Sequence, residues 1–140
     1  MLTNEEAKSY LAELDLDYLA DAMCSSNYPL PRWSRTDVMR CLQHYKNFLW
    51  LQKIHPDLPL VPTKEMDECW HNHILYTKRY TEDCQQIFGR YLHHHPAIPG
   101  KDDATLTAHY LRTKELYLHE FKIPMQTLAK GTIDLSPAAP

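Results

Sequence analysis

Histidine is concentrated in one part of this chain. Five of the nine histidines lie between positions 71 and 95, as a pair and a triplet: His71, His73, His93, His94 and His95. Cys84 lies between the two groups, and Asp67 lies just before the pair. Imidazole, thiolate and carboxylate groups are the ligands that zinc and non-haem iron use in proteins. The segment from Trp70 to Pro96 therefore predicts a metal-binding site.

Spacing limits which of these groups can share one ion. On a helix, Asp67 and His71 are four residues apart and lie on the same face. His71 and His73 are about 200° apart around a helix, so one ion on a regular helix cannot take both. Either the helix is distorted there or one of the two histidines has another role.

Distance along the chain sets a second limit. One straight helix over 64–88 would place His73 and Cys84 about 16 Å apart, which is too far for a shared ion. A bend near Tyr76 would remove that obstacle, because two antiparallel helices could face His71 or His73 toward Cys84. The triplet at 93–95 then returns soon afterwards and can close over the same point.

The elements that position these groups are predicted to be helical. Apolar periodicity, capping residues and prolines predict helices over about 4–14, 17–24, 35–54 and 64–76, another that ends at Phe88, and a last one that ends at Phe121. The inner face of the helix over 35–54 is apolar except for Gln52. His109, on the last helix, is expected to be a surface residue without a special role.

These elements predict an all-α fold. We expect a compact bundle of about five to six helices with a His-rich loop between the last two, since residues 90–101 contain the triplet, two prolines and Gly100. The chain length fits one domain. A single helical domain is predicted over 1–124, containing the motif region 66–96, and a flexible C-terminal tail over 125–140.

Composition excludes several classes of function. The formal net charge is −3 and the pI is near 6.3, without the basic stripe that nucleic-acid binders carry. No apolar run approaches the roughly 20 residues that span a bilayer, and the N-terminus lacks the pattern of a signal peptide. A cytoplasmic protein is therefore expected, with reduced cysteines and no CxxC pair. The oligomeric state cannot be inferred from these features.

The motif region resembles the glycine-rich domain-containing protein-like family. Its run from Met66 to Pro96 shows D-x-x-W-H-x-H-I-L, then Y-x-x-D-C-x-x-x-F-G, then H-H-x-P, in this order. The chain is similar to a short, single-domain, bacterial-type member, without the glycine-rich region of larger plant members. The resemblance implies that His95 is a variable position and assigns no reaction. It implies a motif of Asp67, Trp70, His71, His73, Tyr80, Cys84, His93 and His94.

Three functions remain open at this stage. The first is a small metalloenzyme acting on a small molecule or peptide, with iron for oxidation or zinc for hydrolysis or lyase chemistry. The second is an interaction module stabilised by structural zinc, and the third is a metal-free helical adaptor. The ligand-type residues outnumber the four that a structural site needs, which favours the enzyme. The predicted ligands of the divalent ion, zinc or iron, are Asp67, His71, His73, Cys84, His93 and His94, with Tyr80 as a catalytic proton donor.

Overall fold

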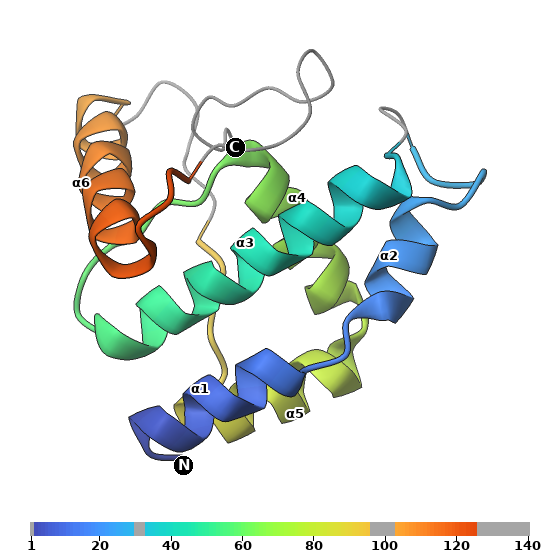
Figure 1. Cartoon of the computed structure of the whole chain (residues 1–140), viewed down its shortest axis with the longest axis horizontal. Coiled ribbons are helices and arrows are strands. Elements are labelled where there is room, and N and C mark those ends of the chain that lie inside the picture. The colour runs from blue at the N-terminus through green and yellow to red at the C-terminus, as the bar shows by residue number, and fades with distance from the viewer. Residues whose placement is uncertain (1, 30–32, 96–102, 126–140) are drawn as a thin grey trace.

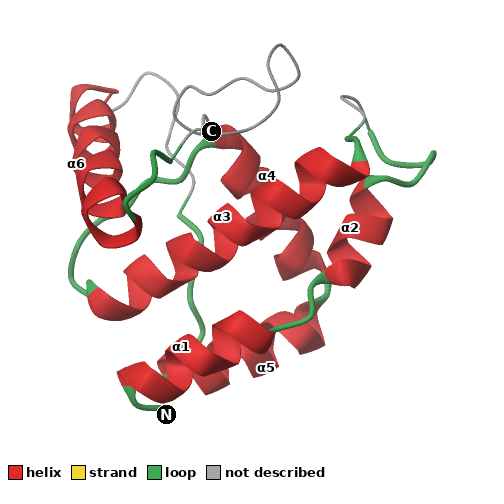
Figure 2. Ribbon diagram, in the orientation of Figure 1, coloured by secondary structure: helices red, strands yellow, loops and turns green. Residues whose placement is uncertain are grey.

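Six helices make up the part of the chain that the structure describes. The computed structural model describes residues 2–29, 33–95 and 103–125, and these residues contain no strand (Figure 2). The helices are α1 (Asn4–Glu13), α2 (Asp17–Met23), α3 (Arg35–Ile54), α4 (Lys64–Leu75), α5 (Thr77–Phe88) and α6 (Asp103–Phe121). The predicted all-α fold of five to six helices is confirmed.

Side-chain caps explain where several helices begin. The Thr3 hydroxyl accepts a hydrogen bond from the backbone N–H of Glu6, and the Glu6 side chain accepts one from Thr3 in return. Ser34 caps α3 and Thr63 caps α4 by the same use of a hydroxyl oxygen. Each cap satisfies a backbone donor that the first turn of a helix leaves without a partner.

Two residues end the helices that carry the histidine motif. Tyr76 leaves the helical region with φ −88° and ψ 70°, so α4 and α5 are separate helices, as the sequence analysis required. Gly89 adopts the left-handed conformation with φ 70°, which glycine reaches without steric cost and which commonly ends a helix. The chain then turns back toward α4.

The core forms around α3, which crosses the middle of the molecule with α6 near one end and α2 near the other (Figure 1). Below it, α1 and α5 lie side by side, and α4 packs against α3 from behind. The buried face of α3 includes Tyr45, Phe48 and Leu49. Cys41 of α3 and Cys69 of α4 are free, buried thiols in the contact between these two helices. The helix that carries Asp67 and His71 is thus held in place by its buried contact with α3.

The end of the helical region differs in one respect from the sequence analysis. Met125, which was assigned to the tail, is only 2% exposed and belongs to the core. The rest of the predicted tail, 126–140, and residues 96–102 of the predicted His-rich loop lie outside the described residues. His93, His94 and His95 lie between α5 and α6 in non-helical chain. None of the described helices is long and apolar enough to cross a membrane.

Candidate metal centre

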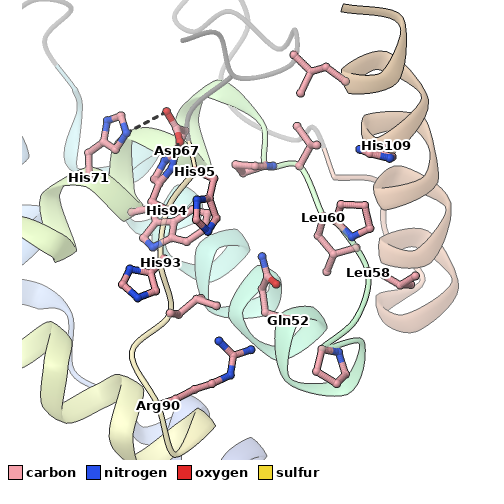
Figure 3. Close-up of a pocket in the computed structure, with 17 residues that line it drawn as sticks. Gln52, Leu58, Leu60, Asp67, His71, Arg90, His93, His94, His95 and His109 are labelled. Atoms are coloured by element: carbon pink, nitrogen blue, oxygen red, sulfur yellow. Dashed lines mark hydrogen bonds and ion pairs between the residues drawn. The ribbon is translucent and has the colours of Figure 1, made fainter. Parts of the chain in front are cut away.

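Three of the six predicted ligands come together at one point. Asp67 and His71 extend from α4, and His94 reaches them from the segment that follows α5 (Figure 3). One ligand atom of each lies within 4.8 Å of the other two. Nε2 of His71 is 3.4 Å from Oδ2 of Asp67, and Nε2 of His94 contacts Oδ1 of the same carboxylate. Within the described part of the chain, no other group of His, Cys, Asp and Glu side chains has this arrangement.

Local helix geometry positions two members of this triad. The i, i+4 spacing places Asp67 and His71 on the same face of α4. Asp67 is buried and His71 is exposed, so the carboxylate lies at the inner end of the site. Both imidazoles direct Nε2 toward this carboxylate, which leaves the three atoms facing a common space.

Two aromatic rings hold His94, the third member of the triad, in place. The His94 ring stacks on Trp70, with centroids 4.3 Å apart and planes 27° apart, and on His71, with centroids 4.7 Å apart. Its Nδ1 is buried and makes no hydrogen bond with any described residue. The stacking therefore orients His94, since its other nitrogen has no partner there to do so.

Tyr80 ties the segment before His94 to α4. Its hydroxyl donates to the carbonyl of Leu92, and Nε1 of Trp70 donates to the Tyr80 oxygen at 2.9 Å. The side chain is only 1% exposed, and burial raises the pKa of this phenol. Tyr80, the predicted proton donor, thus donates its hydrogen bond to a backbone carbonyl and links this segment to Trp70. Its catalytic role stays a prediction.

His73 lies in a separate, buried hydrogen-bond network. Its Nε2 is 2.8 Å from Oδ2 of Asp83, and its Nδ1 is 2.7 Å from the Tyr45 hydroxyl. Tyr10 donates to the other Asp83 oxygen at 2.6 Å. Both ring nitrogens of His73 are therefore occupied, and the network joins α1, α3, α4 and α5. The structure does not bring His73 to the triad.

Cys84 and His93 also lie outside the triad. Cys84 is buried beside Tyr80 and Leu92, and burial raises the pKa of its thiol, which disfavours the thiolate that a metal needs. His93 is exposed, with its ring 4.8 Å from that of Tyr91. It lines the pocket beside the triad instead of joining the cluster.

A pocket of about 450 Å³ opens beside the triad (Figure 3). One wall is the connector 56–62 between α3 and α4, and the other comes from α4 and the segment after α5. Besides the triad, its polar lining residues are Gln52, Arg90, His93, His95 and His109. Sequence reasoning missed Arg90 and gave His109 no role. For Gln52 a signal existed, because it is the polar exception on the inner face of α3.

Fold and site together define an all-α protein with a His/Asp cluster of the kind that can hold a metal ion. Residues 8–114 match the model of the UCP032817-like family. Because this match covers more than half of the chain, the protein belongs to the UCP032817-like family. No curated protein and no solved structure matches the chain.

This match corrects the family suggested by the motif. The glycine-rich domain-containing protein-like family is wrong, because the family model that matches 8–114 is a different one. The motif covers only 66–96, and a short set of rare residues constrains family membership less than a match along most of the fold. The triad itself depends on geometry and is unaffected.

Proposed function

We propose that Asp67, His71 and His94 bind one divalent metal ion and that the protein is a small metalloenzyme acting on a ligand in the adjoining pocket. The observation that carries this proposal is the convergence of three ligand atoms within 4.8 Å beside a pocket of about 450 Å³. A pocket of this size is ordinary for small-molecule sites.

The number of protein ligands favours an enzyme. Structural zinc sites are closed by four protein ligands, whereas catalytic sites use three and leave a position for water or substrate. The cluster offers three, and its exposed member, His71, faces the pocket. His93, His95 and His109 line the same pocket and supply groups that can accept or donate protons there.

The donor set suits two metals. Two imidazoles and one carboxylate are used by non-haem iron(II) oxygenases and by several catalytic zinc sites. We therefore keep two reactions, iron-dependent oxidation and zinc-dependent hydrolysis or lyase chemistry, on a small molecule or peptide. When bound, the ion would supply Lewis acidity toward a substrate oxygen or bound water, and iron would add redox chemistry. Asp67 contributes the charge that offsets the cation.

A structural zinc clip is the second candidate. His94 comes from the segment after α5, while Asp67 and His71 come from α4. An ion shared by them would fasten that segment to the helix, as the structural proposal requires. A cytoplasmic location and the absence of a nucleic-acid partner stay predictions from composition.

Metal titration tests the proposal. The metal-free protein is titrated calorimetrically with Zn²⁺ and, without oxygen, with Fe²⁺, and bound metal is counted by mass spectrometry. We expect one ion per chain for the wild type. Asp67→Asn, His71→Ala and His94→Ala should each lower the affinity about 100-fold or more, since loss of a ligand should exceed the 10–100-fold effect of losing its supporting partner.

His119→Ala is the matched control, because His119 is exposed on α6 and does not line the pocket. A wild-type protein that binds neither ion would refute the proposal. Equal losses for His94→Ala and His119→Ala would do the same. An ion with an exchangeable water favours the enzyme, and a closed, water-free ion favours the clip.

A further inference from the structure

Two polar side chains line the pocket apart from the triad. Arg90 follows the left-handed Gly89 at the end of α5, and Gln52 lies near the end of α3. Figure 3 shows the Arg90 guanidinium below the Gln52 side chain at the same end of the pocket, with His93 between Arg90 and the triad in this view. The pocket thus has a cationic end in addition to the candidate metal end.

Neither side chain has a hydrogen-bond or ion-pair partner in the part of the chain that the structure describes. Within 2–29, 33–95 and 103–125, Arg90 forms no ion pair and the Gln52 side chain forms no hydrogen bond. By contrast, Arg35 pairs with Asp21, and Arg112 pairs with Glu115. An arginine and an amide that line one pocket without such a partner can both donate hydrogen bonds to an anion.

The wall that faces the triad and Arg90 across the pocket is apolar (Figure 3). The connector contributes Pro56, Pro59 and Pro62, which have no N–H, and Leu58 and Leu60. The backbone N–H of Val61 is already used, because it donates to Oγ1 of Thr113 at 2.9 Å. This wall offers few hydrogen bonds and favours the carbon skeleton of a ligand.

Charge favours an anion. Among the described lining residues Asp67 is the one carboxylate, and both triad histidines contact it. With a divalent ion bound and neutral histidines, the formal charges of ion, Asp67 and Arg90 are +2, −1 and +1, which leaves the pocket positive. Positive clefts raise the local concentration of anions. The planar guanidinium matches a carboxylate with two parallel hydrogen bonds.

We propose that the pocket binds a small organic acid with an apolar body, its carboxylate held by Arg90 and Gln52 and its other end beside the metal centre. The last part and the net positive charge of the pocket rest on the proposed function, whereas the contact between the carboxylate and Arg90 depends on the guanidinium and needs no metal ion. Arg90 is thus a residue that determines substrate class. Its exposure places the carboxylate at the mouth, where a ligand enters.

Octanoate and octanol are suitable probes, because they share an eight-carbon chain and differ in charge. Dissociation constants are measured by NMR shift titration for metal-free and Zn²⁺-loaded protein. We expect octanoate to bind at least tenfold more tightly than octanol in both states. Arg90→Gln should remove that preference, and Arg90→Lys should retain part of it, since lysine keeps the charge without the fork. Gln52→Leu should weaken octanoate but not octanol.

Arg112→Gln is the control, because Arg112 is exposed on α6 outside the pocket. Equal binding of octanoate and octanol overturns the inference, as does an equal effect of Arg90→Gln and Arg112→Gln. Octanoate binding that requires Zn²⁺ and is unchanged in Arg90→Gln also overturns the inference, because the carboxylate would then coordinate the metal ion. Zinc affinity is measured in parallel on the same variants. Loss of metal binding with Arg90-dependent octanoate binding refutes only the proposed metal function.

Discussion

Replacing Asp83 with alanine removes the acceptor that two side chains share. His73 donates to one carboxylate oxygen at 2.8 Å, and Tyr10 donates to the other at 2.6 Å. His73 is 1% exposed, so the substitution leaves its Nε2 donor without its acceptor in a buried site. The hydroxyl of Tyr10 is only half-buried and can turn to solvent.

The expected loss follows from these two environments. An unsatisfied buried donor costs about 1–3 kcal/mol and a replaceable hydrogen bond about 1 kcal/mol, so the free energy of unfolding should fall by about 3 kcal/mol. With an unfolding entropy of about 2.1 cal/mol/K per residue, the 140 residues give about 0.3 kcal/mol/K. The melting temperature should therefore fall by about 10 °C.

Urea denaturation and thermal melting measure both quantities. Glu82→Ala is the matched control, because Glu82 is the exposed neighbouring residue on α5. If Asp83→Ala and Glu82→Ala differed by less than about 1 kcal/mol, the network would not stabilise the fold as argued. Zinc stoichiometry of Asp83→Ala should equal that of the wild type. A loss of bound zinc would instead place His73 in the metal site.

Three further outcomes are expected. Zinc at 100 times its dissociation constant should stabilise the wild type by about 2.7 kcal/mol, or about 9 °C in melting temperature. The same zinc concentration should shift His94→Ala by about 1 °C at most. Burial lowers the pKa of His44 from its ordinary 6.5, so the unfolded chain binds the extra proton and stability falls as pH drops below about 6.5. In urea at about pH 7.5 and 5.5, His44→Gln should lose less stability on acidification than the wild type; equal losses would contradict this. Thr63→Ala removes the cap that accepts from the Met66 N–H and should cost about 1 kcal/mol in urea denaturation, and an unchanged midpoint would contradict it.

The helices were predictable because their signals are local. Ser34 and Thr63 cap the helices that the sequence assigned to them, and Gly89 ends α5. The face shared by Asp67 and His71 follows from the helical repeat alone. These features depend on residues within one or two turns, which a single sequence displays directly.

The division of the histidines was not predictable in this way. His73 is fixed by Tyr45, which is 28 residues away along the chain. His94, and not His93 or His95, joins the triad because its ring stacks on Trp70 after the chain has turned at Gly89. Which histidines reach the triad is decided by packing between helices, and residue spacing alone does not predict it.

The same packing places Arg90 and His109 in one pocket, although they lie on different elements. Gln52 was visible as an exception to an apolar pattern, but its meaning needed the position of the connector 56–62. A polar residue on a buried helix face is thus a useful signal whose interpretation requires tertiary structure.

The stacked contact of Trp70 and His94 makes the fluorescence of Trp70 an intrinsic probe of the site. Indole emission is quenched by a nearby protonated imidazole, so the light from Trp70 reports the charge of the ring stacked on it. With Trp33 and Trp50 replaced by phenylalanine, one emitter would remain, beside the triad. Events at the site would then be followed in real time, without a dye and without knowledge of the substrate.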